Sequence, residues 1–184
     1  VLNGTTPLFS FIIATLWLKL NTNLVQLMGI LIGIIGLVIF VGFESLEFSL
    51  FALMLCLGAS FLYAFSSNFI FKTQSIDATY LAAMTLLFAT FLVFPFTFLE
   101  TGLHLNHSNE VLLSVFLLGF ACTGLAYMGY VVLIKRAGPV RASTVVLIVP
   151  ISGMLWANLF LNEVITLTML LGCLLIITGV GLIN

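Results

Sequence analysis

The chain has 184 residues, of which 62% are hydrophobic and only 6% are charged, and its formal net charge is −1. A water-soluble domain carries roughly 25% charged residues, so a chain this poor in charge is expected to lie in a lipid bilayer. The nearly neutral balance lacks the basic patch of a nucleic-acid-binding protein, and we expect no nucleic-acid partner.

Seven apolar runs follow one another along the chain, each near the roughly 20 residues that a membrane-spanning helix needs. The runs are Leu2–Leu18, Leu24–Gly42, Phe48–Phe71, Ala78–Leu99, Val111–Ile134, Ala142–Leu161 and Ile165–Ile183. Each run is continuously apolar, whereas the strands of a membrane barrel would alternate. The pattern therefore predicts an all-α polytopic membrane protein with seven transmembrane helices.

Charged residues sort by sign between the runs. If every run spans the membrane, successive breaks lie on alternate sides, and only Asp77 departs from the sorting. One side then holds Lys19, Lys72, Lys135, Arg136 and Arg141, and the other holds Glu44, Glu47, Glu100, Glu110 and Glu163. Short loops on the cytoplasmic side of a membrane carry an excess of Lys and Arg. We therefore expect a multi-pass inner-membrane protein with a cytoplasmic C-terminus.

The chain also contains an internal repeat. Aligning Pro7 with Pro150 places three further pairs in register without a gap, namely Ala14 with Ala157, Gly29 with Gly172 and Gly36 with Gly179. The first proline run is directed inward and the second outward, so the predicted copies are inverted. Inverted repeats are typical of secondary transporters.

The second copy has three helices ahead of its proline run, and the first copy has none. We therefore interpret residues 1–42 as the last two helices of one five-helix repeat and residues 48–184 as a complete second repeat. This interpretation predicts three further helices, on the order of 90 residues, ahead of the first run. The alternative is a protein that has seven helices only.

Several short motifs resemble the drug/metabolite transporter superfamily, specifically its EamA-type ten-helix permeases. The motifs are the turn Lys135–Ala142, Leu147–Ile151, Leu159–Glu163 and the Gly172–Gly179 spacing, with Thr6–Phe9 and Gly29–Gly36 in the first copy. One departure is Leu20, where the family commonly has an acid. The resemblance implies an inner-membrane transporter of a small metabolite, such as an amino acid or a drug-like compound.

Pro150 is the first candidate for the substrate site. Proline has no N–H and displaces the carbonyl four residues before it, here that of Val146. A discontinuous helix near mid-membrane often marks the substrate site of a transporter. The alternative is a kink that serves packing only.

Polar and aromatic residues at helical spacing provide the other candidates. Ser60, Tyr63 and Ser67 share one face of the third run, and Ser152 and Trp156 share a face of the sixth. A third face, on the fifth run, is formed by Thr123, Tyr127 and Tyr130. These side chains could line a substrate cavity, or the hydroxyls could bond their own helix backbone.

Gly29 and Gly33 form a GxxxG motif, followed by Gly36. Small residues let helix backbones approach closely, and we expect packing inside the bundle here, with a homodimer interface as the second interpretation. Gly119, Gly124 and Gly129 are expected to serve close packing as well.

No Asp, Glu, Lys, Arg or His lies in the interior of any run. An intramembrane protease needs such groups to activate water, and a haem-carrying bundle needs axial ligands. We therefore predict no enzymatic activity, no cofactor and no metal. The favoured function is transport by alternating access, and the alternative is a membrane subunit that serves assembly alone.

Overall fold

The computed structural model describes residues 2–42, 50–98 and 108–183, and every regular element in these ranges is helical. The all-α polytopic class predicted from composition is thereby confirmed. The elements are η1 (Leu2–Thr5), α1 (Thr6–Leu16), α2 (Leu24–Val41), α3 (Leu50–Lys72), α4 (Ala78–Val93), η3 (Phe94–Phe98), α5 (Asn109–Leu117), η4 (Leu118–Leu125), α6 (Ala126–Ala137), α7 (Pro139–Ser143), α8 (Val145–Leu161) and α9 (Leu167–Ile183).

Five helical segments in the described part of the chain are long and apolar enough to cross a membrane. They are Leu24–Val41, Leu50–Lys72, Ala78–Thr97, Asn109–Ala137 and Pro139–Leu161. The α9 helix is equally apolar but has 17 residues. The first predicted run differs most from expectation, because it forms a 3-10 turn and then an α-helix of 11 residues.

Local signals set several helix ends. The α2 helix begins with a capping box, in which the Asn23 side chain accepts a hydrogen bond from the Gln26 amide at 2.8 Å and the Asn23 amide donates to the Gln26 side-chain oxygen at 3.4 Å. The helix ends at Gly42, whose φ of +82° suits a residue without a Cβ. Gly138, with φ of +88°, precedes Pro139 at the first position of α7.

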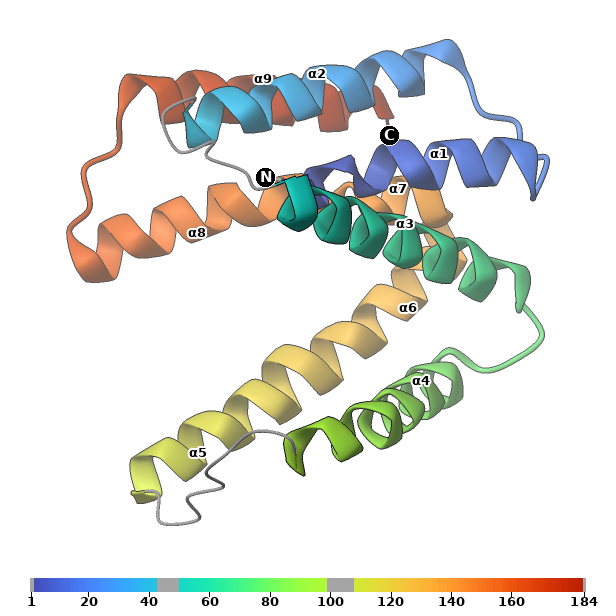
Figure 1. Cartoon of the computed structure of the whole chain (residues 1–184). Helices are drawn as coiled ribbons and strands as arrows, with labels where there is room; N and C mark the ends of the chain where they lie inside the picture. Colours follow the sequence, from blue (N-terminus) through green and yellow to red (C-terminus); the bar gives the residue numbers. More distant parts are fainter. Residues whose placement is uncertain (1, 43–49, 99–107, 184) are drawn as a thin grey trace. The chain divides into compact units, whose positions relative to one another are not determined.

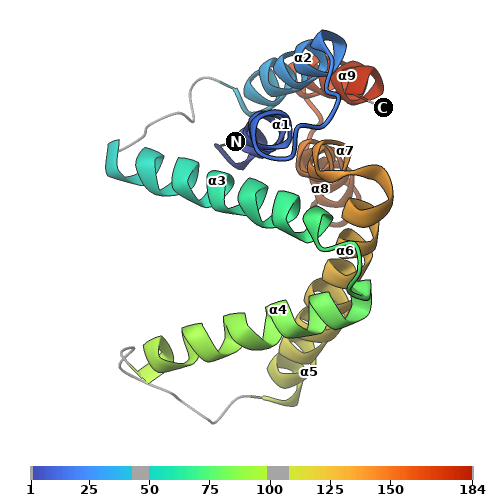
Figure 2. The ribbon, with the colours of Figure 1, turned by 90° about the vertical axis from the view of Figure 1, so that its right-hand side faces the viewer.

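The chain forms two compact units, and the first contains η1, α1, α2, α3, α7, α8 and α9. Within this unit α2 and α9 lie side by side and make the most extensive helix contact of the described chain (Figure 1). Figure 2 shows α1 nearly end-on, with α2 on one side and α3 and α7 on the other. The α1 helix is therefore the central element of this unit.

Glycines bring α2 and α9 into backbone contact. A Cβ built on Gly179 would lie 2.5 Å from the carbonyl oxygen of Gly29, and one built on Gly172 would lie 2.7 Å from that of Gly36. Gly29 thus faces the repeat counterpart of Gly36, and Gly36 faces the counterpart of Gly29. This reciprocal, antiparallel pairing is what a two-fold relation between inverted copies requires.

The second unit contains residues 73–136. Its α5, η4 and α6 segments form one continuous helix whose middle, Leu118–Leu125, has π geometry. The Lys135 side chain donates to the carbonyl oxygens of Thr73, at 2.9 Å, and of Ile76. The end of α6 is thereby bonded to the turn before α4.

Two contacts in the first unit join other helix ends. The Lys72 ammonium lies 4.8 Å from the centre of the Trp17 ring, near the break that contains Lys19. The Gln26 side chain donates to the carbonyl of Ile183 at 3.4 Å, which joins the start of α2 to the end of α9. The sorting of charges predicted these neighbours to share one side. Glu44, Glu47 and Glu100 lie outside the described residues.

Candidate functional site

A cavity of about 390 Å³ lies in the first unit, where the beginnings of α1 and α8 meet. We call it the repeat cavity, and its lining residues are Asn3, Gly4, Thr6, Leu37, Tyr63, Val146, Val149 and Pro150. Under the alignment that pairs Pro7 with Pro150, Asn3 corresponds to Val146 and Thr6 to Val149. The same helical positions from both copies therefore line one space.

The described lining of the repeat cavity carries no charged side chain. Its polar groups are the Asn3 amide, the Thr6 hydroxyl and the Tyr63 phenol, and the remaining walls are apolar or glycine. A mostly apolar cavity with a few hydrogen-bonding groups is typical of sites for small organic molecules. The surroundings favour an uncharged ligand, because an unpaired charge is costly to bury.

Pro150 lies inside α8, at the sixth position of the helix. The residue that would donate to the Val146 carbonyl is this proline, so that helical hydrogen bond is missing. Val146 and Pro150 both line the repeat cavity. The gap in the backbone ladder of α8 therefore lies beside the cavity, where such gaps are tolerated in a membrane protein.

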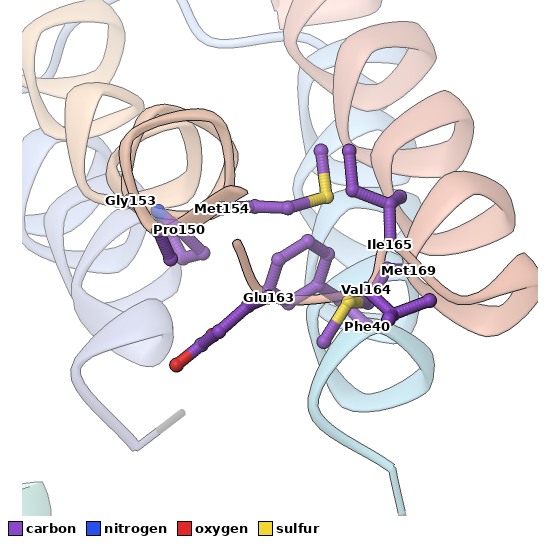
Figure 3. Close-up of a pocket in the computed structure, with 9 residues that line it drawn as sticks. Phe40, Pro150, Gly153, Met154, Glu163, Val164, Ile165 and Met169 are labelled. Atoms are coloured by element: carbon purple, nitrogen blue, oxygen red, sulfur yellow. The ribbon is translucent and has the colours of Figure 1, made fainter. Parts of the chain in front are cut away.

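A second cavity, of about 280 Å³, lies toward the Glu163 end of α8 (Figure 3). We call it the Glu163 cavity, and its lining residues are Phe40, Pro150, Gly153, Met154, Ala157, Glu163, Val164, Ile165 and Met169. Figure 3 shows Met154 extending from α8 toward α9, while the Glu163 carboxylate points away from Met154 and Met169. Pro150 is common to both linings, so the proline turn of α8 borders both cavities.

The backbone of Glu163 closes the C-terminus of α8. Asn162 adopts the left-handed conformation with φ of 54°, and the Glu163 amide donates to the Ala157 carbonyl at 3.4 Å. The Asn158 side chain donates to the Glu163 carbonyl at 2.7 Å. Capping uses the main chain of Glu163, which leaves its carboxylate available at the edge of the Glu163 cavity.

Six of the predicted site residues belong to the first unit, and one of them, Ser60, is buried and donates to the Cys56 carbonyl at 3.0 Å. Tyr63 and Pro150 line the repeat cavity, whereas Ser67 is buried and donates to the Tyr63 carbonyl at 3.0 Å. Ser152 is exposed and donates to the Val149 carbonyl at 2.8 Å. Trp156 is exposed and stacks on Phe160 with ring centres 5.5 Å apart. The structure thus brings two of the six to one cavity.

The other three predicted residues, Thr123, Tyr127 and Tyr130, belong to the second unit. Their grouping on one face assumed α-helical spacing, but Thr123 lies in the π segment. Its hydroxyl donates to the carbonyl of Leu118, five residues back, at 3.1 Å. A π turn holds more residues than an α turn, so Thr123 is rotated away from the face that strict α spacing predicts. The role of all three in substrate binding stays a prediction.

The sequence analysis missed a buried polar contact between α1 and α3. Asn68 is fully buried, and its side-chain nitrogen donates to the Ser10 hydroxyl at 3.1 Å and to the Ala64 carbonyl at 2.8 Å. Its side-chain oxygen has no partner among the described residues. The signal was present in the sequence, since an amide in the interior of an apolar run needs a hydrogen-bond partner when it is buried.

Comparison with known proteins gives one family. Residues 50–184 match the model of the EamA-like transporter family. The chain is 22% identical over 182 residues to "Uncharacterized transporter YvbV" and 27% identical over 185 residues to "Uncharacterized transporter YoaV", both from Bacillus subtilis (strain 168). These alignments cover 97% and 98% of the chain, which spans 59% and 63% of the two relatives.

The alignment with a third relative is shorter. The chain is 34% identical over 94 residues to "Uncharacterized transporter in sor 3'region" from Acidianus ambivalens. That alignment covers 51% of the chain and 37% of the relative.

Proposed function

Because the chain belongs to the EamA-like transporter family, we propose that it forms part of a secondary transporter for a small organic metabolite. Of the two examples expected from the sequence, an amino acid and a drug-like compound, the lining of the repeat cavity, uncharged among the described residues, favours an uncharged drug-like compound. Transport proceeds across the cytoplasmic membrane by alternating access, and the repeat cavity is the substrate site. The observation that carries the proposal is the lining of that cavity by matching positions of two proline-containing segments.

The mechanism follows from the relation between the copies. The reciprocal glycine contacts of α2 and α9 hold equivalent helices of the copies in backbone contact. Two inverted copies can exchange conformations, so a site between their proline segments would open first to one side and then to the other. The interrupted backbone of α8 provides a place where the helix can bend.

The Lys and Arg residues support a cytoplasmic C-terminus, because the positive-inside rule counts the bias in short loops. The contacts of Lys72 with Trp17 and of Gln26 with Ile183 join the helix ends that this orientation groups together. The proposed division into residues 1–42 and 48–184 assigns α1 and α2 to one repeat and α3 through α9 to the other.

Pro150→Ala in the complete protein provides the test. Alanine restores the donor to the Val146 carbonyl and removes the ring clash, so the variant should be at least as stable as the wild type. We expect uptake or efflux in proteoliposomes, screened with labelled amino acids and drug-like compounds, to fall about tenfold, equivalent to about 1.4 kcal/mol.

Pro95→Ala is the matched control, since Pro95 lies in η3 and lines neither cavity. Wild-type transport in Pro150→Ala would remove the substrate role of this segment. A wild-type protein that moves none of the screened solutes would favour the assembly subunit instead.

A further inference from the structure

The two proline segments differ in the donors available to the carbonyl four residues before each proline. Pro150 deprives the Val146 carbonyl of its α-helical donor. The matching carbonyl, that of Asn3, lies in the 3-10 turn η1 ahead of Pro7, where the donor is the amide three residues later. The Thr6 hydroxyl also donates to the Asn3 carbonyl, at 2.7 Å, so this acceptor is satisfied within the chain.

The second copy lacks this hydroxyl. The position that corresponds to Thr6 is occupied by Val149, which has nearly the same shape but no hydroxyl. No side chain in the described part of the chain donates to the Val146 carbonyl; the nearest hydroxyl along the helix, that of Ser152, donates to Val149 instead. The substitution of valine for threonine thus leaves one acceptor without the partner that its counterpart has.

The residues around this acceptor line the repeat cavity. The carbonyls of an α-helix point along the axis toward the residue four positions later. Val146, Val149 and Pro150, which bracket the missing bond, all line the repeat cavity. A carbonyl beside an apolar cavity gains most from a donor, because an unsatisfied polar group is costly away from water.

We propose that the Val146 carbonyl is the specificity-determining acceptor of the repeat cavity, and that it binds the N–H or O–H group of an uncharged solute. The proposal rests on the substrate role of this cavity. The absence of charge from its described lining favours an amide or alcohol over an ammonium or carboxylate. The apolar walls around Leu37 and Val149 would hold the hydrocarbon part of the same molecule.

The test exchanges Val149 and Thr6, which occupy matching positions of the two copies. Val149→Thr places a hydroxyl three residues after the Val146 carbonyl, as Thr6 is placed relative to Asn3, and threonine in a helix can bond a carbonyl at that spacing. Val149→Ile keeps the branched shape without a hydroxyl and is the matched control. Thr6→Val is the reciprocal variant, and Val149→Ser offers a smaller hydroxyl should threonine not be accommodated.

Three probes of similar size distinguish a neutral hydrogen-bond donor from a charged one and from a molecule without a donor. They are 3-phenylpropanamide, its N,N-dimethyl analogue, which has no donor, and 3-phenylpropylammonium, which is charged. Binding to the complete protein in detergent is measured by the ligand-induced shift in melting temperature. The wild type should bind 3-phenylpropanamide more tightly than either other probe. Val149→Thr should raise the Kd of the amide about five- to tenfold, the effect of one hydrogen bond, and leave that of the dimethyl analogue unchanged.

Without any probe, Val149→Thr should raise the melting temperature by about 2 °C relative to Val149→Ile, because the acceptor gains a partner. Equal Kd values of the amide for the wild type and Val149→Thr, equal binding of amide and dimethyl analogue, or binding of the ammonium as tight as that of the amide would each overturn the proposal. So would a wild type that binds none of the three.

The outcomes for the two proposals are distinct. If the wild type binds the amide as expected but moves no solute in proteoliposomes, the transport function fails and the acceptor stands. If transport proceeds and Val149→Thr leaves its solute preference unchanged, the acceptor fails and the transport function stands.

Discussion

Glycines are used differently in the α2–α9 pair and in the long helix formed by α5, η4 and α6. In the pair, a Cβ on any of the four repeat glycines would lie within 3 Å of the backbone of the facing helix. In the long helix, Gly119 and Gly129 have no atom within 4 Å of a built Cβ in the described chain, and Gly124 meets only its own helix. Our expectation of close packing at these three glycines is not met within the second unit. Glycine spacing alone does not identify a helix interface, whereas its recurrence in both copies does.

The largest effect is expected where the backbones touch. Gly179→Ala places a Cβ 2.5 Å from the Gly29 carbonyl oxygen, an atom that cannot move without shifting α2. We expect the free energy of unfolding to fall by about 3 kcal/mol, measured by denaturant titration in detergent.

Two glycines serve as controls for Gly179→Ala. Gly181 lies in the same helix and Gly129 in the long helix, and a Cβ built on either meets no atom of the described residues within 4 Å. Alanine at these positions should raise stability by about 0.5 kcal/mol, since glycine weakens a helix interior. Similar losses at Gly179 and Gly181 would contradict the backbone contact of α2 and α9.

A smaller effect is expected at the contact that ties the two helices of the second unit together. Lys135→Met removes the donor to the carbonyls of Thr73 and Ile76 while keeping an unbranched side chain. The loss should be about 1 kcal/mol, at the low end for a charged donor because the side chain is only partly buried.

Arg136→Met removes the same charge from an exposed neighbour, and its stability should stay near that of the wild type. If both variants lose equally, the loss reflects net charge and not the bonds of Lys135.

The smallest effect concerns pH. The backbone amides of Tyr80 and then Thr79 donate to the Asp77 carboxylate and lower its pKa below the ordinary value. A carboxyl whose pKa is lower in the folded state stabilises the fold above its unfolded pKa, and this contribution disappears as the pH falls through the folded pKa.

Asp77→Asn keeps a capping side chain that does not titrate. The ordinary pKa of an aspartate is about 4. We therefore expect helix α4 to become less stable below about pH 4 in the wild type but not in Asp77→Asn. Circular dichroism melts between about pH 3 and pH 6 would show it. Parallel acid profiles of the two proteins would speak against the cap.

Much of the fold was predictable because apolar runs in lipid have few structural options. A chain with so few charges must satisfy its backbone inside each segment, and helices do so locally. Leu24–Gly42, predicted from hydropathy, therefore agrees with α2 to within one residue. The first run deviates because Pro7 lies near its start, where a 3-10 turn precedes the α-helix. The π segment left no periodic signal, since its neighbours are uniformly apolar.

The site was less predictable. Pro150 and Tyr63 were candidates for substrate binding, and both line the repeat cavity. Asn3, Thr6 and Val149 line it too, yet nothing in their local sequence distinguishes them from other helix positions. Ser152 and Trp156 share a face with no described cavity, because a helical face can be occupied by lipid, by another helix or by a site.

By itself the sequence determined the helical class, the division into apolar runs and the repeat, because hydropathy, charge and the spacing of proline and glycine act within one segment or recur between two. Only the tertiary structure decided which positions of the two copies meet. Helix pairing depends on the shapes of both surfaces at once, and neither segment carries the shape of its partner. The reciprocal contact of Gly29 with Gly179, and the meeting of Thr6 and Val149 at one cavity, became evident only in the structure.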